Sequence, residues 1–305
     1  MTTEKKHSPL LPVLGGILGA GAVSVGGAYA VMKVTIAGNH KFFIWPDNKP
    51  FYDKVTSTYA SELWTRRSFD HLKLKAHHFS PKAPSHTWAV VVHGYHGNYT
   101  DMMPYACHYL EKGYQVLMPH LRGHGLSQGD YVGFGYHDHF DLMTFIDSIV
   151  KKDPQARILL HGMSMGAATV MMASGETLPS QVKCTIADAG FTDAYEQCAY
   201  HMKRAYHIPA FPVLDALDFL MKLRYKYSLR QCTPIRSVTH ACVPILFIHG
   251  EADDFVPYSM MQPLYEACSS EKKMLSVKDA KHVESIFKDP ELFWKTADAF
   301  AEKYL

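Results

Sequence analysis

Short apolar runs alternate along this chain with longer stretches in which apolar residues recur every three or four positions. The run Trp88–Val92 is continuously apolar, which is typical of a strand buried on both faces of a sheet. Leu72–Phe79 alternates between apolar and polar residues, as an edge strand does. Similar apolar runs, which we interpret as further strands, lie at Gln115–Pro119, Arg157–Leu160, Cys184–Ala187, Pro244–Ile248 and Met274–Val277.

The longer stretches predict helices between these strands. Amphipathic patterns fall around residues 100–112, 138–152, 165–175, 257–268 and 290–304. This alternation predicts an α/β fold, in which helices flank a mostly parallel central sheet. Binding sites in such sheets lie beyond the carboxyl ends of the strands, so the residues that follow each run are the first candidates for chemistry.

The amino-terminal segment has a different character. Residues 8–32 contain no charged residue, and six of the 20 glycines of the chain fall among them. A helix of this length, rising about 1.5 Å per residue, would span a hydrocarbon core of roughly 30 Å. Lys5 and Lys6 precede the segment, as is expected for an amino terminus held in the cytoplasm. We therefore expect residues 1–33 to be a single-pass membrane anchor, with the rest of the chain outside the cytoplasm.

Two other interpretations of this segment stay open. Ala28-Tyr29-Ala30 has the small residues of a signal-peptide cleavage site, in which case the protein would be secreted after removal of the signal. A soluble or interfacial helix is the third interpretation, and six glycines disfavour it because glycine weakens helices. The polar and aromatic residues 34–65 are interpreted as a linker to one domain that covers residues 66–305.

The charge balance argues against one class of partner. The 305 residues include 31 Lys and Arg and 29 Asp and Glu, for a net charge of +2. Residues 1–33 hold three lysines and one glutamate, so residues 34–305 carry 28 basic and 28 acidic residues. A nucleic-acid-binding domain would keep a basic excess, and we expect no nucleic-acid partner. The six cysteines are widely spaced without a CxxC pair and indicate neither a disulfide framework nor a metal site.

A serine stands at the end of one predicted strand. Gly162-Met163-Ser164-Met165-Gly166 has the pattern G-x-S-x-G and lies between the strand at Arg157–Leu160 and a helix. A sharp turn there leaves the serine side chain exposed at its apex, and the two glycines give it room. Ser164 would also lie at a helix amino terminus, where the amide dipoles favour developing negative charge. Ser164 is therefore the candidate nucleophile.

A serine hydroxyl needs a base to remove its proton, and that base is usually a histidine held by a carboxylate. Asp253 and His282 each follow a late predicted strand, at the same sheet edge as Ser164. We expect Asp253 to orient His282 without itself taking a proton. Two other acids stay open as alternatives, namely Asp188 at the end of a strand and Asp254 beside Asp253.

The tetrahedral intermediate of acyl transfer needs hydrogen-bond donors for its oxyanion. We expect the backbone N–H groups of Met165, directly after the nucleophile, and of Tyr95, in the loop after Trp88–Val92, to supply them. Histidines cluster in several loops, but none matches a zinc motif such as HExxH, and no metal is expected. Arg122 lies in a glycine-rich turn and is expected to tie backbone together.

Five segments together resemble, in their order and spacing, the motifs of the α/β-hydrolase superfamily. They are His93–Gly97 (HGYHG), Arg122–Ser127 (RGHGLS), Gly162–Gly166 (GMSMG), His249–Pro257 (HGEADDFVP) and Asp279–His282 (DAKH). The resemblance covers about residues 66–305 and is closest to bacterial membrane-attached serine hydrolases of the esterase or lipase type. The sequence departs from the family pattern at Asp254, which adds a second carboxylate beside the acid position.

The resemblance implies a catalytic triad of Ser164, Asp253 and His282 that hydrolyses a small ester or lipid-like substrate without a cofactor. It also implies that residues of about 192–240, inserted after the sixth strand, form a helical cap. Aromatic cap residues together with Met163, Met165 and Phe255 are expected to line an apolar acyl pocket. A peptidase or acyltransferase with the same triad, and a non-catalytic membrane scaffold, are the alternatives.

Overall fold

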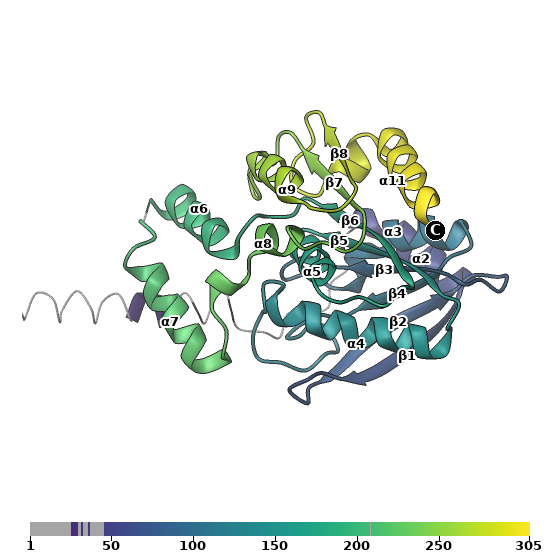
Figure 1. Cartoon of the computed structure of the whole chain (residues 1–305), viewed down its shortest axis with the longest axis horizontal. Coiled ribbons are helices and arrows are strands. Elements are labelled where there is room, and N and C mark those ends of the chain that lie inside the picture. The colour runs from purple at the N-terminus through teal and green to yellow at the C-terminus, as the bar shows by residue number, and fades with distance from the viewer. Residues whose placement is uncertain (1–25, 30–31, 33–35, 37–45, 208) are drawn as a thin grey trace, which may run out of the picture.

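The computed structural model describes residues 26–29, 32, 36, 46–207 and 209–305 (Figure 1). Its strands are β1 (Ala60–Arg67), β2 (Lys73–Ser80), β3 (Thr87–Val92), β4 (Gln115–Pro119), β5 (Arg157–Met163), β6 (Val182–Asp188), β7 (Ile245–Gly250) and β8 (Lys272–Val277). Its longer helices are α2 (Lys49–Thr58), α3 (Met103–Glu111), α4 (Tyr136–Lys152), α5 (Met165–Ser174), α6 (Ala194–Tyr206), α7 (Val213–Tyr225), α9 (Met261–Ala267) and α11 (Pro290–Tyr304). Two short helices are α8 (Pro234–Val238) and α10 (Ser285–Lys288), and four single turns are η2 (Pro46–Asn48), η3 (Tyr99–Met102), η4 (Leu229–Gln231) and η5 (Tyr258–Met260).

The eight strands form one sheet in the order β1-β2-β4-β3-β5-β6-β7-β8. β1 pairs with β2, and β2 with β4, in antiparallel fashion, and all other neighbours are parallel. The predicted α/β fold with a mostly parallel sheet and flanking helices is thus confirmed. Parallel pairing brings the carboxyl ends of β3, β5, β6, β7 and β8 to a single edge of the sheet.

The core has two layers, one on each face of the sheet. Trp88, Val90 and Val92 of β3 pack with residues of α4 and α5, whereas Ala89 and Val91 pack with residues of α3 and α11. Figure 1 shows α4 and α5 in front of the sheet and α3 and α11 behind it. Burial on both faces explains why β3 is a continuous apolar run in the sequence.

The sheet begins earlier in the chain than the predicted boundary at residue 66. Helix α2 and most of β1 fall within residues 34–65, which the sequence suggested to be a linker. Only Trp64 of β1 is buried, so the strand lacks the alternation that would have revealed it. It is held by antiparallel pairing with β2 along its whole length, from Ala60 opposite Ser80 to Arg67 opposite Lys73.

Most of the predicted membrane segment, residues 1–25, lies outside the described residues. Among the described helices none is both long and apolar enough to cross a bilayer. Ala28 and Met32, at the carboxyl-terminal end of the segment, and Ile36, just after it, are buried in the core layer that contains α4 and α7 residues. The backbone of Ile36 also accepts a hydrogen bond from the N–H of Val132 at 2.8 Å.

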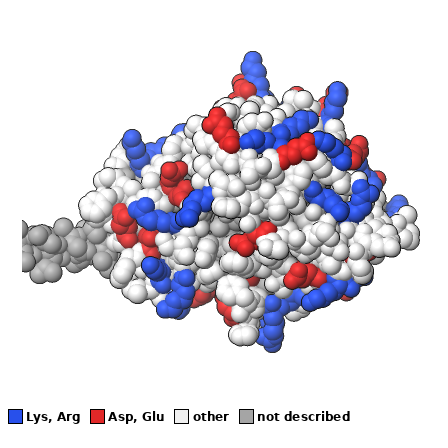
Figure 2. All heavy atoms as spheres, in the orientation of Figure 1, with Lys and Arg blue, Asp and Glu red and all other residues white. Residues whose placement is uncertain are grey.

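Between β6 and β7 the chain forms α6, α7, η4 and α8. Helices α6 and α7 project beyond the sheet on the left of Figure 1. They occupy the segment in which the sequence predicts a cap. On the face of the molecule in Figure 2, basic and acidic side chains are interspersed, in keeping with the neutral balance of residues 34–305.

Candidate active site

Ser164 lies at a sharp turn between β5 and α5. Its backbone has φ 55° and ψ −116°, a conformation that residues with a side chain rarely adopt. The backbone N–H of Ser164 donates to the carbonyl oxygen of Asp188 at 2.8 Å, which ties the turn to the end of β6. The turn is therefore strained and held from outside, as a nucleophile elbow is.

Close packing explains both glycines of the G-x-S-x-G pattern. A Cβ at Gly162 would lie 2.1 Å from the carbonyl oxygen of Gly166, and a Cβ at Gly166 would lie 2.1 Å from that of Val92. Both neighbours are backbone atoms, which cannot move aside as the end of a side chain can. Glycine is thus required at position 162 by the turn itself and at position 166 by the contact of the turn with β3.

Replacing Gly162 with alanine is expected to destabilise the protein by about 3 kcal/mol, the upper end of the usual cost of overpacking, because the added methyl group meets backbone. Urea unfolding followed by circular dichroism measures this loss. Gly27→Ala is the control, since a Cβ at Gly27 meets no atom within 4 Å and alanine favours the helix there, so the midpoint should not fall. Equal midpoints for Gly162→Ala and the wild type would contradict the expected overpacking.

Three side chains from three strand ends meet at the elbow. The ring nitrogen Nε2 of His282 lies 3.0 Å from Oγ of Ser164, and Nδ1 lies 2.8 Å from Oδ2 of Asp253. An ionised carboxylate only accepts hydrogen bonds, so Nδ1 carries the proton and Nε2 is left free to accept from the serine. Ser164 and Asp253 are 6% exposed, and His282 is partly buried. The structure therefore brings together the three residues that the sequence suggested.

The carboxylate of Asp253 accepts hydrogen bonds from four donors. Its Oδ1 accepts from the backbone N–H groups of Phe255 and Val256, at 3.0 and 2.9 Å. Its Oδ2 lies 2.8 Å from Nδ1 of His282 and 3.1 Å from Nε2 of His249. Burial alone would raise the pKa of Asp253, but the bonds from the two histidines outweigh it and lower that pKa to about 2. Asp253 is therefore an anion throughout the neutral range.

His249 is a site residue that the sequence did not single out. It is the penultimate residue of β7, four residues before Asp253, and it is buried. Its Nε2 also lies 3.0 Å from the carbonyl oxygen of Val256. Because both neighbours of Nε2 are acceptors, this nitrogen must carry the proton. The signal was present as the spacing His-Gly-x-x-Asp after a strand, but only the fold turns His249 towards the carboxylate.

The two alternative acids have other partners. Oδ2 of Asp188 accepts from the hydroxyl of Tyr105 at 2.9 Å, beneath the site. Asp254 is exposed and pairs with Arg204 of α6. Of the three carboxylates, it is Asp253 that forms a hydrogen bond with His282.

Asp188 should make stability depend on pH. Burial raises its pKa to about 6, despite the hydrogen bond from Tyr105. Between its ordinary pKa and about 6 the folded protein retains a proton that the unfolded chain releases, so stability falls as pH rises through that window. Asp188→Asn cannot ionise and should gain roughly 1–3 kcal/mol over the wild type between pH 4.5 and pH 7.5. Urea unfolding at several pH values tests this expectation, and parallel stability curves for the two proteins would contradict it.

Both predicted oxyanion residues lie beside the serine. Met165 is the first residue of α5, so its N–H belongs to the first turn of a helix that begins at Ser164. The loop after β3 lies against the serine, since a Cβ at Gly94 would be 3.2 Å from Cβ of Ser164. Tyr95 follows, half-buried, with its ring stacked on that of Phe134 at 5.6 Å. Their roles as oxyanion donors stay predictions.

The predicted substrate-binding residues flank the triad. The ring centroid of Phe255 lies 4.8 Å from that of His282, and Phe255 is 43% exposed. Met163 directly precedes Ser164 and is partly buried. Helix α6 covers the acid loop, since Nε2 of Gln197 donates to the carbonyl oxygen of Phe255 at 2.7 Å. In the described part of the chain, no three His, Cys, Asp or Glu side chains gather as a metal site would require.

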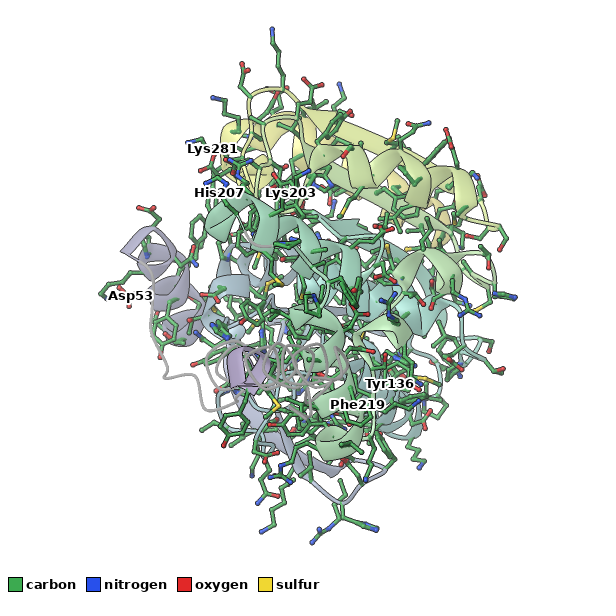
Figure 3. The ribbon with its side chains drawn as sticks, turned by 90° about the vertical axis from the view of Figure 1, so that its left-hand side faces the viewer. Asp53, Tyr136, Lys203, His207, Phe219 and Lys281 are labelled. Carbon is green, nitrogen blue, oxygen red and sulfur yellow. The ribbon has the colours of Figure 1, made fainter. Side chains whose placement is uncertain are left out.

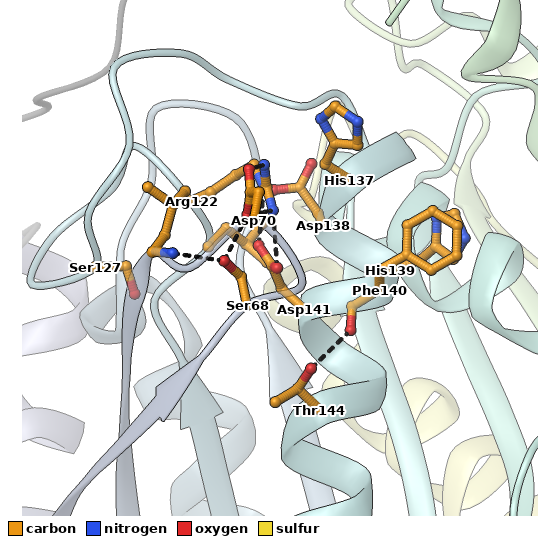
Figure 4. A network of polar contacts seen from close by, with 12 residues as sticks. Ser68, Asp70, Arg122, Ser127, His137, Asp138, His139, Phe140, Asp141 and Thr144 are labelled. Carbon is orange, nitrogen blue, oxygen red and sulfur yellow. Dashed lines mark hydrogen bonds and ion pairs between the residues drawn. The ribbon is translucent and has the colours of Figure 1, made fainter. Parts of the chain in front are cut away.

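A buried arginine holds one wall of the site. The guanidinium of Arg122 is fully buried and makes two hydrogen bonds to Asp141, at 2.8 and 2.9 Å. It also bonds to Asp70, at 3.0 and 3.2 Å (Figure 4), and to the hydroxyl of Tyr131. These contacts tie the loop after β4 to α4 and to the loop after β1, and Phe134 of the first loop packs on Tyr95. Arg122 therefore joins three segments through their side chains, whereas the sequence suggested that it would tie backbone together.

Comparison with known proteins gives several matches. A family model described as "Serine aminopeptidase, S33" matches residues 83–232. The protein YqkD of Bacillus subtilis is 30% identical over 230 residues, which cover 75% of this chain and 75% of YqkD. A thermostable monoacylglycerol lipase from a Bacillus species is 26% identical over 231 residues, 70% of this chain and 90% of the lipase.

Solved structures share the fold. The Pyrococcus furiosus esterase Pf2001 superposes with a TM-score of 0.69 at 20% sequence identity. The match covers 88% of this chain and 98% of the esterase. At this identity the likeness concerns the fold alone.

Proposed function

Because this chain belongs to the α/β-hydrolase superfamily, we propose that it is a serine hydrolase that cleaves carboxylic esters through an acyl-enzyme. The observation that carries the proposal is the hydrogen-bonded chain from Ser164 through His282 to Asp253. Acyl transfer by a serine hydrolase needs three groups. They are a serine at a strained turn, an imidazole whose free nitrogen faces that serine, and a carboxylate on the other side of the imidazole.

In the first half of the reaction, Oγ of Ser164 attacks the acyl carbon while Nε2 of His282 takes its proton. The negative charge on the former carbonyl oxygen is held by the N–H groups of Met165 and Tyr95. His282 then gives the proton to the departing alkoxide, and an alcohol leaves. Asp253 keeps its charge and stabilises the imidazolium that forms between these steps.

In the second half, water takes the place of the alcohol. His282 removes a proton from the water as it attacks the acyl-enzyme, and then returns that proton to Oγ of Ser164 as the acid leaves. No cofactor or metal enters either half. Met163 and Phe255, together with apolar residues of α6, are proposed to contact the acyl group.

A membrane is the proposed location of the reaction. The uncharged residues before Ala28, from residue 8 to residue 27, favour a single-pass anchor with the enzyme outside the cytoplasm, since Ala28 and Met32 pack in the core of the protein. Secretion after cleavage is the alternative. Similarity to a monoacylglycerol lipase supports a small ester or a lipid-like substrate.

A peptidase with the same triad is the second candidate, since the matching family model is described as a serine aminopeptidase. An acyltransferase would use the same residues, with an alcohol replacing the water. A non-catalytic scaffold, which is the candidate from a different class, would have no need of the complete triad.

Matched chromogenic substrates separate these functions. The full chain in detergent micelles is assayed with p-nitrophenyl esters of increasing acyl length and with amino-acid p-nitroanilides. We expect hydrolysis of the esters and kcat/KM at least about 100-fold lower for the anilides, because the amide bond is the harder of the two to cleave. Preference for the anilides would make the protein a peptidase and overturn the proposed ester hydrolysis.

His249 is expected to act as a positioning residue through Asp253. Hydrogen bonds to charged groups contribute about 1.5–3 kcal/mol, so His249→Leu should lower kcat roughly 10- to 100-fold with little change in KM. His249→Gln keeps an N–H donor and should restore most of kcat. Equal loss of kcat in the Leu and Gln variants would contradict this role.

A further inference from the structure

One side of helix α7 exposes large apolar side chains beside lysines. Phe219 is 61% exposed and Leu223 is 55% exposed, and Phe211, just before the helix, is 74% exposed. Lys222 and Lys226 are exposed as well. Phe219, Lys222 and Leu223 stand at positions i, i+3 and i+4, and therefore share one face of the helix, and Lys226 follows as the residue that caps its carboxyl-terminal end. We call these five residues the α7 face: Phe211, Phe219, Lys222, Leu223 and Lys226.

The α7 face is the outer side of a helix that is firmly packed on its inner side. Leu214, Leu217 and Met221 are buried against the body of the protein. Exposure of Phe219 and Leu223 is therefore not a sign of a loosely attached helix. Neighbouring apolar side chains exposed to this extent usually mark a surface that contacts something apolar.

The charge of the α7 face is positive, because the acids of the helix are engaged elsewhere. Asp215 pairs with Arg230 at 2.9 Å. Asp218 accepts hydrogen bonds from the hydroxyl of Ser228 and from the backbone N–H of Leu229. Residues 193–232 hold six Lys and Arg against four Asp and Glu, whereas residues 34–305 as a whole are neutral. A helix with phenylalanine and leucine beside lysines fits an interface with anionic lipid.

The amino-terminal segment reaches the body of the protein beside this helix. Ala28, Met32 and Ile36 are buried in the same core layer as Leu214, Leu217 and Met221. The backbone of Val132 joins the two parts, since its N–H donates to Ile36 and its carbonyl oxygen accepts from the hydroxyl of Tyr227. Figure 3 looks onto this side of the molecule, with Phe219 and, from α6, Lys203 on it.

We propose that the α7 face lies on the surface of the membrane to which residues 1–33 attach the protein. Phe211, Phe219 and Leu223 enter the boundary between headgroups and acyl chains, and Lys222 and Lys226 contact anionic headgroups. The proposal rests on the membrane attachment proposed above and is independent of the chemistry at Ser164. It would hold the hydrolase in one orientation, with α7 against the bilayer and α6 between α7 and the loop of Asp253.

A fluorescent label at Leu223 tests the contact. The full chain carries Cys242→Ser, which removes the exposed native thiol, and either Leu223→Cys or Leu292→Cys. Leu292 is 39% exposed and lies on α11, which makes it the matched control. Each cysteine is labelled with an environment-sensitive nitrobenzoxadiazole dye, and the protein is reconstituted in vesicles of phosphatidylcholine and phosphatidylglycerol with or without brominated acyl chains. Phe219→Cys is a second labelling site if Leu223→Cys does not fold.

We expect the dye at position 223 to emit at shorter wavelength in vesicles and to be quenched at least about twofold by brominated lipid, while the dye at 292 behaves as in water. Quenching at 223 should weaken in vesicles of phosphatidylcholine alone, because the lysines then lose their anionic partners. Flotation of the vesicles on a density gradient separates bound from unbound protein. If the dye at residue 223 emits as in water although the protein floats with the vesicles, the proposal is overturned. Emission at short wavelength without quenching would overturn it as well, because it would mean that protein, a second copy included, covers the face. Protein that does not float with vesicles would overturn the membrane attachment itself and leave the proposed hydrolysis untouched.

Discussion

Ser164→Ala is expected to lower kcat for ester hydrolysis roughly 10⁴- to 10⁶-fold, because the acyl-enzyme can no longer form. The folded protein should be little changed, since the turn depends on Gly162, Gly166 and the backbone of Ser164, and alanine can keep that backbone. Steady-state kinetics with a p-nitrophenyl ester, together with an unfolding curve, measure both properties. A variant that keeps more than about a tenth of wild-type kcat would show that another group is the nucleophile.

Asp253→Asn is expected to lower kcat roughly 10³- to 10⁴-fold. The amide would offer His282 an N–H in place of an acceptor, so the imidazole would present the wrong nitrogen with its proton towards Ser164. The loss should appear in kcat with KM nearly unchanged, because Asp253 is buried behind His282 and does not face the substrate.

The neighbouring carboxylates provide controls for Asp253→Asn. Asp254→Asn removes an exposed charge that pairs with Arg204 and should change kcat by less than about threefold. Asp188→Asn alters a group bonded to Tyr105 and should lower kcat far less than Asp253→Asn. A larger loss in Asp188→Asn than in Asp253→Asn would reassign the acid of the triad.

Much of the fold could be predicted because its central strands are buried on both faces. Continuous apolar runs mark β3, β5, β6 and β7, and the chemistry-bearing residues follow their ends. The edge strand β1 could not be predicted, because it buries only Trp64 and exists through pairing with β2. A periodic pattern reports burial, and a strand without burial leaves no pattern.

The candidate site divides in the same way. Ser164, Asp253 and His282 could be proposed because each follows a strand whose carboxyl end reaches the same sheet edge. The contact of His249 with Asp253 could not, because it depends on how the chain turns after β7. Likewise, only the fold brings Phe134 onto Tyr95, or Ile36 to Val132, since these contacts join segments far apart in the sequence.

The central claim is that Ser164 is an activated nucleophile. The full chain is treated with a fluorophosphonate probe, which phosphonylates a serine only when a neighbouring base activates it, and the modified peptide is identified by mass spectrometry. We expect one adduct on Ser164 that forms in the wild type and in Asp254→Asn, and that is lost in Ser164→Ala. Absence of labelling in folded wild-type protein, or an adduct on another residue, would contradict the proposed serine hydrolase.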